Sequence, residues 1–190
     1  TGLDYFVPQD TCVEFNVKQN YIAWCIGASY TQKALSKEQI INTCNQLPLR
    51  VVLLGGANEK EKGKYIMQKS SNSNIDNFCG NLSLHQSAYL LKHSALVLTN
   101  DTGLMHIASS LKKPIISFWG CTKPSLGFSP YMNKNHDIRI VSRPKKRPCS
   151  KHGNFCRVQQ QGCIKQIDYN VIIRELESFF DLFISQDPGT

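Results

Sequence analysis

The sequence contains no run of about 18 consecutive apolar residues, so we expect no segment that spans a membrane. It also shows no internal repeat, no low-complexity tract and no signal-peptide pattern. The chain begins at Thr1 without an initiator Met, which favours a segment of a longer protein. Because no signal directs it to secretion, we expect a reducing, cytoplasmic compartment.

The composition suits one α/β domain. The 190 residues are 41% hydrophobic and 19% charged, which is enough apolar material for a real core. The formal net charge of +8 predicts an acidic partner: a phosphorylated small molecule, an anionic membrane surface or nucleic acid. The chain lacks a stripe of aromatic residues interleaved with Lys and Arg, so a basic nucleic-acid-binding module is the weaker alternative.

Much of the positive charge lies in one Pro-containing segment. Its basic residues are Arg139, Arg143, Lys145, Lys146, Arg147 and Lys151. Two interpretations stay open for this segment. It is either a solvated basic loop or a surface that holds the protein near acceptor phosphates or at the inner face of the inner membrane, as a peripheral contact.

Cysteine usage argues against a disulfide framework, although the chain has eight cysteines. Cys25 and Cys79 occur in apolar, strand-like contexts, and Cys44 falls on the apolar face of a predicted helix. A thiol in such a place acts as a small apolar side chain. We therefore expect these three cysteines to be buried and reduced.

Three further cysteines, Cys149, Cys156 and Cys163, form a cluster with six residues between successive members. Structural zinc sites usually have about two to four residues within a ligand pair, so this spacing is wide. His152 would supply the fourth ligand of such a site. We favour a Cys-rich loop packed on the domain, with zinc binding as the alternative.

Apolar runs and helix signals alternate along the chain. Strands are predicted at residues 21–27, 50–56, 74–79, 95–99, 114–119 and 137–141, with helices between most of them and one at the end. Nearly continuous apolar strands predict a parallel sheet covered on both faces. We therefore expect a doubly wound, Rossmann-like domain over residues 21–184. Residues 1–20 and 185–190 are predicted to be a linker and a tail.

Two helices have clear starting signals. Capping boxes are predicted at Ser36 with Gln39 and at Ser83 with Gln86. In a capping box the Ser side chain accepts from the backbone N–H of the Gln, and the Gln side chain accepts from the backbone N–H of the Ser. The second of these helices is expected to carry Leu84, Ala88 and Leu91 on one face.

The strongest local signal is Asn100-Asp101-Thr102-Gly103-Leu104-Met105-His106, which stands where a strand ends and a helix begins. Free backbone N–H groups and the positive end of the helix dipole form an anion site there. Gly103 lets a diphosphate approach the backbone, Thr102 adds a hydroxyl donor and His106 adds an imidazole. The plainer alternative makes Asp101 an N-cap and His106 an ordinary helical side chain.

Two more loops follow strands at the same expected edge of the sheet. Ser29 and Lys33 follow the first strand, and Lys commonly binds phosphate as a point charge. Glu59 follows the second strand, where a carboxylate can accept hydrogen bonds from a ribose or a base; Glu61 is close enough to leave the register open. The alternatives are a solvated charge for Lys33 and a first-turn helix carboxylate for Glu59.

The run VLTNDTGLMHIASSLKKPIISFWGCTKP, residues 97–124, resembles the signature of glycosyltransferase family 9, the ADP-heptose:lipopolysaccharide heptosyltransferases. Phe118, Gly120 and Thr122 occupy the places of the family's Phe-Gly-x-Thr pattern. The GASYTQK, VVLLGGANE and CGNLSL segments follow in the family's order, and the resemblance covers about residues 21–184. The Cys-bearing loop also resembles one found near the end of many members.

The resemblance implies a GT-B architecture, with two Rossmann-like domains facing each other across a cleft. This chain would be the carboxyl-terminal half, which binds the nucleotide diphosphate, and the catalytic base would lie in an amino-terminal domain that it lacks. The implied reaction is an inverting transfer of a sugar, heptose in the first place, from an ADP-sugar to a lipopolysaccharide-type acceptor in bacteria. No cofactor and no metal ion are expected, and the chain has no Asp-x-Asp motif.

The resemblance also implies roles for particular residues. It puts Lys33 and Ser29 on the phosphates, Glu59 near the ribose or adenine, and Leu82 against the base. It assigns the diphosphate and donor sugar to Asp101, Thr102, Gly103, Leu104 and His106. Ala28 departs from the pattern, because some members have a hydroxyl residue there.

The expected partners are a nucleotide-sugar donor, a lipid-linked saccharide acceptor and the protein's own amino-terminal domain, without nucleic acid. An alternative is the half-domain of another GT-B enzyme, such as a sugar-nucleotide epimerase.

Overall fold

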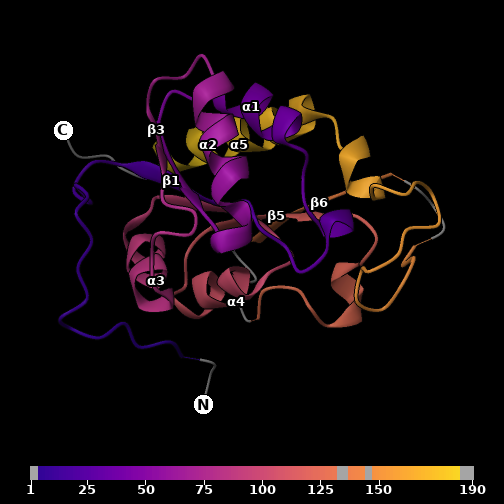
Figure 1. Ribbon diagram of the computed structural model, residues 1–190, viewed down its shortest axis with the longest axis horizontal. Helices are drawn as coiled ribbons and strands as arrows, with labels where there is room; N and C mark the ends of the chain where they lie inside the picture. Colours follow the sequence, from indigo (N-terminus) through magenta and orange to yellow (C-terminus); the bar gives the residue numbers. More distant parts are fainter. Residues whose placement is uncertain (1–3, 132–136, 144–146, 185–190) are drawn as a thin grey trace.

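Six parallel strands form one sheet in the order β3-β2-β1-β4-β5-β6 (Figure 1). The computed structural model describes residues 4–131, 137–143 and 147–184. The strands are β1 (Tyr21–Cys25), β2 (Arg50–Leu54), β3 (Ile75–Asn77), β4 (Leu96–Asn100), β5 (Ile115–Trp119) and β6 (Asp137–Val141). The strand order reverses between β1 and β4, which is the topological switch point of a doubly wound sheet. The predicted Rossmann-like fold is confirmed.

The helices form a layer on each face of the sheet (Figure 1). One layer holds α1 (Lys37–Cys44), α2 (Lys60–Lys69) and α5 (Tyr169–Ile184), and the other holds α3 (Leu84–His93) and α4 (Gly103–Ser110). Both predicted capping boxes are present, at Ser36 with Gln39 and at Ser83 with Gln86. Helices α1 to α4 lie in the connections between successive strands, since parallel strands need a crossover connection.

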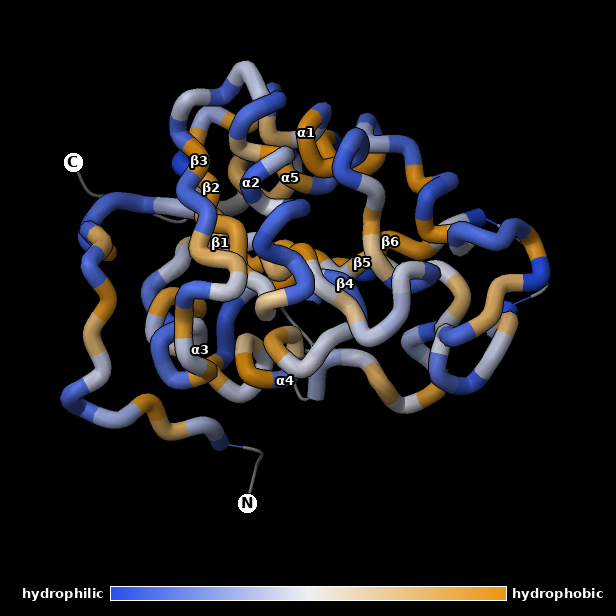
Figure 2. Tube along the Cα trace, in the orientation of Figure 1, coloured by the Kyte–Doolittle hydropathy of each residue, from blue (hydrophilic) through white to orange (hydrophobic). Residues whose placement is uncertain are grey.

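The core fills both faces of the sheet, because successive side chains of each strand point to opposite sides. Ile22 and Trp24 of β1 pack into the cluster under α1 and α5, whereas Tyr21 and Ala23 pack into the cluster under α3 and α4. Figure 2 shows hydrophobic residues along the strands between the two helix layers. The same two-sided burial accounts for the continuous apolar strands in the sequence. Cys25, Cys44 and Cys79 are buried in these clusters, as predicted.

Residues 4–20 contain no helix or strand and run along the α3 side of the domain (Figure 1). Val13, Phe15 and Val17 pack against the cluster under α3 and α4. The ring of Phe15 meets Tyr21 edge-on at 5.1 Å between centroids. This segment therefore covers part of the domain as well as leading into it. Residues 185–190, predicted to be a tail, lie outside the described ranges.

None of the described helices has the length and apolar composition needed to cross a membrane.

Candidate functional site

A pocket of about 400 Å³ lies at the carboxyl ends of β1, β2 and β4, beside the switch point. Its lining residues are Cys25, Gly27, Ala28, Ser29, Gly55, Gly56, Asn58, Glu59, Leu84, Thr102, Gly103, Leu104 and Ile107. Ligand pockets commonly measure about 300–1,000 Å³, so the volume suits a small molecule. The structure thus brings together five predicted site residues from three loops: Ser29, Glu59, Thr102, Gly103 and Leu104.

The start of α4 forms one wall of this pocket. Thr102 is the N-cap, and its hydroxyl accepts a hydrogen bond from the backbone N–H of Met105 at 3.4 Å. The first N–H groups of a helix have no intrahelical acceptor, so those of Gly103 and Leu104 are available to a ligand. A Cβ added at Gly103 would meet no atom within 4 Å. Packing therefore does not require this glycine, whereas close approach of a ligand would.

Glu59 lies against the carboxyl ends of β1 and β2. Its Oε2 accepts a hydrogen bond from the backbone N–H of Gly56 at 2.9 Å. Added Cβ atoms at Gly27 and Gly55 would lie only 2.9 Å and 2.7 Å from the Glu59 side chain, so these two glycines make room for it. Glu59 is thus a first-turn carboxylate and a pocket residue at once. Glu61, the alternative left open by the sequence, lines a different pocket over α2.

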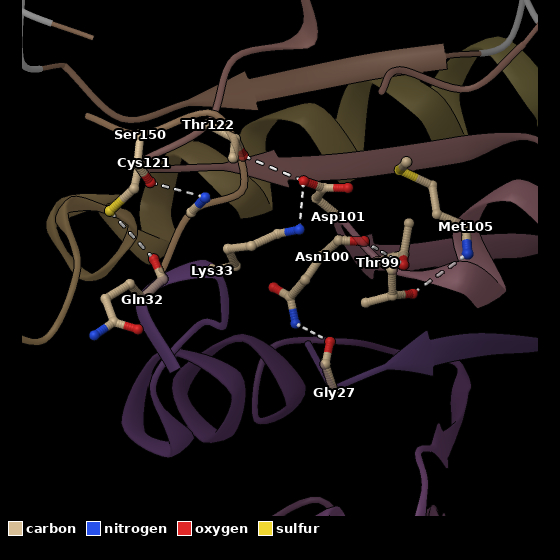
Figure 3. Close-up of polar contacts among 12 residues, drawn as sticks. Gly27, Gln32, Lys33, Thr99, Asn100, Asp101, Met105, Cys121, Thr122 and Ser150 are labelled. Carbon is tan, nitrogen blue, oxygen red and sulfur yellow. Dashed lines mark hydrogen bonds and ion pairs between the residues drawn. The ribbon is translucent and has the colours of Figure 1, made fainter. Parts of the chain in front are cut away.

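Asn100 is a positioning residue, which the sequence analysis included in its strongest local signal without giving it a role. It is fully buried at the end of β4. Its side-chain amide donates to the carbonyl of Gly27 at 3.1 Å (Figure 3). Its side-chain oxygen accepts from the N–H of Leu35 at 3.3 Å. It thereby ties the loop after β1 to β4. A polar residue at the end of an apolar strand was the available signal.

Lys33 is buried in an ion pair rather than open to solvent. Its Nζ lies 2.7 Å from Oδ2 of Asp101, and the two side chains are 11% and 8% exposed. Thr122 donates its hydroxyl to the same carboxylate oxygen at 3.3 Å (Figure 3). The alternative that Lys33 is a solvated charge is therefore wrong. So is the alternative that Asp101 caps α4, because Thr102 holds that position.

His106 and Leu82 do not line the pocket. His106 is exposed on α4, and Leu82 is partly buried against the cluster under α3 and α4. Leu84 takes the expected place of an apolar wall residue and is joined there by Ile107. Of the three residues predicted to share one face of α3, Ala88 and Leu91 are buried, whereas Leu84 is not. As the first residue of α3 it precedes the turn that packs on the sheet, and it is 56% exposed.

The three clustered cysteines are brought together, and a fourth joins them. Cys121, just after β5, lies with Cys149, Cys156 and Cys163, and all four are buried. Cys121, rather than His152, completes the set. The sequence reasoning missed Cys121 because 27 residues separate it from the next member.

A Rossmann-like sheet with glycine-containing loops and an open helix N-terminus at its switch point defines a class of domain that binds phosphorylated nucleotides. The family model described as glycosyltransferase family 9 (heptosyltransferase) matches residues 2–157. The chain therefore belongs to glycosyltransferase family 9, and the predicted family is confirmed.

Curated relatives agree with this assignment. The chain is 31% identical over 146 residues to lipopolysaccharide heptosyltransferase 2 of Salmonella typhimurium, covering 69% of this chain and 40% of that protein. It is 29% identical over 142 residues to the Escherichia coli protein of the same name, covering 70% and 40%. The chain thus spans well under half the length of these relatives.

Solved structures share the fold. A family 9 glycosyltransferase from Veillonella parvula superposes with a TM-score of 0.72 at 19% identity, over 87% of this chain and 47% of that one. The E. coli ADP-heptose lipopolysaccharide heptosyltransferase II gives a TM-score of 0.59 at 22% identity, over 86% and 49%. Each of these matches covers about half of the larger protein.

Proposed function

We propose that this chain is the donor-binding domain of an inverting glycosyltransferase that transfers heptose from an ADP-sugar to a lipopolysaccharide-type acceptor. The observation that supports this most directly is the pocket at the switch point. It joins the free N–H groups at the start of α4 to the loops after β1 and β2. The names of the curated relatives, and the ADP in a solved E. coli heptosyltransferase of the same fold, support the choice of donor.

In this proposal the diphosphate lies against the first turn of α4. The backbone N–H groups of Gly103 and Leu104 and the hydroxyls of Thr102 and Ser29 are its donors, and the helix dipole favours its negative charge. Lys33, in its ion pair with Asp101, and His106 flank this position as further positive or polar groups. Both are assigned by family resemblance.

The nucleoside would extend toward the loop after β2. Glu59 accepts hydrogen bonds from the ribose or adenine there. Leu84, Leu104 and Ile107 supply apolar surface for the base, in place of the Leu82 that the resemblance suggests.

The chemistry assigned to this domain is stabilisation of the leaving diphosphate. Negative charge grows on that group as the glycosidic bond breaks. Donors already in place stabilise such charge more than water does, because they need not reorganise. The acceptor hydroxyl would attack from the opposite face, with its proton taken by a base in the amino-terminal domain. Neither a cofactor nor a metal ion takes part in the proposed transfer.

Calorimetry on the 190-residue chain tests the proposal. ADP should bind, UDP and GDP should bind more weakly, and no sugar should be transferred by this chain alone. Glu59→Gln should weaken ADP binding, whereas Glu61→Gln, on the other side of α2, should leave it unchanged. A preference for UDP would favour another GT-B enzyme, such as an epimerase. No binding of any nucleotide would refute the site.

A further inference from the structure

Four cysteine thiols converge beside the carboxyl end of β5. Cys121 follows β5, Cys149 and Cys156 belong to the loop after β6, and Cys163 begins the 3-10 turn η4 (Cys163–Gln166). Their exposures are 0%, 4%, 7% and 0%, and among the described residues they form a cluster with no other buried hydrophobic side chain. Four buried thiols with no aliphatic or aromatic member among them are an unusual way to fill a core.

The distances between the four sulfur atoms fit a tetrahedral metal site. The four Sγ atoms lie within 4.8 Å of one another, and the Cys121–Cys163 and Cys149–Cys156 pairs are each 3.9 Å apart. Zinc–thiolate bonds of about 2.3 Å at tetrahedral angles place the sulfur atoms about 3.8 Å apart. A disulfide would instead bring two sulfur atoms to about 2.05 Å.

A hydroxyl donor also reaches the cluster, as donors do around thiolate ligands. The hydroxyl of Ser142 donates to the Sγ of Cys163 at 3.4 Å. Such a donor stabilises negative charge on sulfur, which a metal-bound thiolate carries and a neutral thiol does not.

The backbone is closely packed where the ligand segments begin. Gly120 precedes Cys121, and a Cβ added there would lie 2.5 Å from Cβ of Ile164. Gly162 precedes Cys163 with φ +96°, and its added Cβ would lie 2.4 Å from the carbonyl oxygen of Gln32. The backbone N–H of Cys149 also bonds the carbonyl of Cys121 at 2.8 Å. These contacts fix the positions of the thiols relative to one another.

Two of the four cysteines, Cys149 and Cys156, lie in a long loop without regular secondary structure. In its described part, residues 142–143 and 147–162, the loop between β6 and η4 has no helix or strand. Loops of this length in a compact domain are uncommon unless something else orders them. Gly153 of this loop nevertheless lies close to Lys33. A Cβ added at Gly153 would lie 2.5 Å from Cδ of Lys33.

We propose that Cys121, Cys149, Cys156 and Cys163 bind one thiophilic divalent cation, Zn²⁺ or Fe²⁺, in a closed structural site. All four coordination positions are filled by thiolates, so the ion is shielded from substrate and water. Its task is to hold the loop after β6 against the end of β5, and thereby to support the Lys33–Asp101 pair. The interpretation of these residues as a loop held by packing alone is replaced by one in which a metal ion holds it.

Elemental analysis of the full chain, purified without chelator under reducing conditions, is the first test. We expect about one equivalent of zinc or iron per chain. Visible sulfur-to-metal charge-transfer absorption identifies iron, which zinc does not show. Reconstitution with Co²⁺ should give the intense visible bands of tetrahedral cobalt thiolate. Removal of the ion by a strong chelator should lower the Tm, and added Zn²⁺ should restore it.

Matched variants separate this site from the other thiols. Cys149→Ser and Cys156→Ser should lose the metal, whereas Cys12→Ser, at an exposed position, and Cys44→Ala, in the core under α1, should keep it. Should the ligand variants fail to fold, the cobalt spectrum of the unaltered chain still shows whether the thiols bind a metal ion. No metal uptake from equimolar Zn²⁺ or Fe²⁺ under reducing conditions overturns the proposal. So does full metal content in both ligand variants, or a mass showing two disulfides among the four cysteines.

Discussion

Gly103 and Gly55 both line the candidate pocket, but only Gly55 is required there by its neighbours. A Cβ added at Gly55 would lie 2.7 Å from Cβ of Glu59, whereas one added at Gly103 would meet nothing within 4 Å. The backbone of Gly103 is also outside the positive-φ region that excludes other residues. A glycine that neither packing nor backbone conformation requires points to what approaches it from outside.

Gly103→Ala should therefore separate binding from folding. Alanine at a compatible backbone position restricts the unfolded chain, so the free energy of unfolding should stay the same or rise by about 0.4–1 kcal/mol. The affinity for ADP should fall about tenfold or more, because the methyl group keeps the diphosphate from charge-assisted N–H donors. Thermal unfolding and calorimetry on the same preparation check both. Unchanged affinity would exclude the first turn of α4 as the phosphate site.

Lys33 and Asp101 form the most buried of the described ion pairs, which changes what their replacement should do. Each charge is compensated mainly by the other, and Thr122 adds one hydrogen bond. Removing one partner leaves the other charge in a poorly solvated place. The pair consequently supports the fold, in addition to any contact with the donor.

Lys33→Met keeps the aliphatic packing against Gly153 but removes the charge. We expect it to lower the free energy of unfolding by about 3–5 kcal/mol, as for other broken buried pairs. The double variant Lys33→Met, Asp101→Asn should recover most of this stability without recovering ADP affinity. Urea unfolding measures the first quantity and calorimetry the second.

The pair of Arg50 and Asp76, which is more accessible to solvent, is the matched control. Its side chains are 31% and 29% exposed, and its N–O distance is 2.6 Å. Asp76→Asn should cost no more than about 1 kcal/mol. If Lys33→Met lowers the free energy of unfolding as little as this, the Lys33–Asp101 ion pair does not stabilise the fold.

At the scale of secondary-structure elements, α2 connects the loop that carries Ser29 to the rest of the domain. The ammonium of Lys62 donates to the carbonyls of Leu35 at 2.8 Å and Ile26 at 3.3 Å. These carbonyls lie just before α1 and just after β1, so one side chain joins three elements. Burial, with a smaller effect of the nearby Lys165, lowers the pKa of Lys62 to about 8 from its usual 10.5.

This lowered pKa predicts a pH dependence of stability. Between about pH 8 and pH 10.5 the unfolded chain binds the Lys62 proton more tightly than the folded chain, so unfolding takes up a proton there. The contribution of Lys62 to the free energy of unfolding should therefore rise with pH, by at most about 1.4 kcal/mol per pH unit. Below about pH 8 its unfavourable desolvation is present in full.

The measurement is the difference in unfolding free energy between the unaltered chain and Lys62→Met at several pH values from about 7 to 10. Taking the difference removes groups that titrate equally in both proteins. Lys64→Met, at an exposed position of the same helix, is the matched control. A difference for Lys62→Met that does not change with pH would contradict a lowered pKa.

At the scale of the whole molecule, the +8 charge is concentrated in the basic segment between residues 139 and 151. The structure assigns two of its side chains to internal contacts. Arg139 pairs with Asp137 at 2.6 Å, and Arg147 donates to the carbonyl of Gly120 at 3.4 Å. Arg143 and Lys151 are exposed. Lys145 and Lys146 lie outside the described residues.

We predict that this segment binds anionic membranes. The triple variant Lys145→Ala, Lys146→Ala, Lys151→Ala should reduce co-sedimentation with phosphatidylserine-containing liposomes, because each lost charge removes about 1 kcal/mol of attraction near such a surface. Added salt should reduce binding of the unaltered chain. Arg147 is left in place, since its contact with Gly120 would confuse binding with folding.

The control removes the same charge elsewhere. Lys60, Lys64 and Lys69 are exposed on α2, and their triple alanine variant should bind liposomes nearly as well as the unaltered chain. Equal losses in both variants would indicate a response to net charge alone. In that case the basic segment would be a solvated loop, the interpretation that the sequence also left open.

Local signals predicted the elements well and their exact packing poorly. The capping boxes at Ser36 and Ser83 formed as expected, because their hydrogen bonds join residues three positions apart. Leu84 is exposed rather than buried with Ala88 and Leu91, although the helix that it begins was predicted. Whether the first residue of a helix faces the core depends on how the helix enters the layer, and periodicity does not contain that angle.

The candidate site divides in the same way. The place of Thr102 and Gly103 at the start of a helix was predictable, because a strand-to-helix junction is local; anion binding there stays a prediction. The Lys33–Asp101 pair was not, since its partners come from loops 68 positions apart in the chain. Ionic contacts between distant segments leave no pattern in one sequence, so their burial becomes visible only in the folded domain.

The sequence by itself determined a parallel α/β domain, its family signature and the strand-to-helix junction at which we propose that a diphosphate binds. Strand hydrophobicity, capping residues and the Asp-Thr-Gly turn act within a few residues of the chain, so they can be read in order. The tertiary structure alone decided which residues meet. It moved Lys33 into an ion pair, exchanged Leu82 for Leu84 in the pocket wall and added Cys121 to three later cysteines. Each of these depends on how strands 3-2-1-4-5-6 are ordered in space, because that order brings loops from distant parts of the chain to one edge of the sheet.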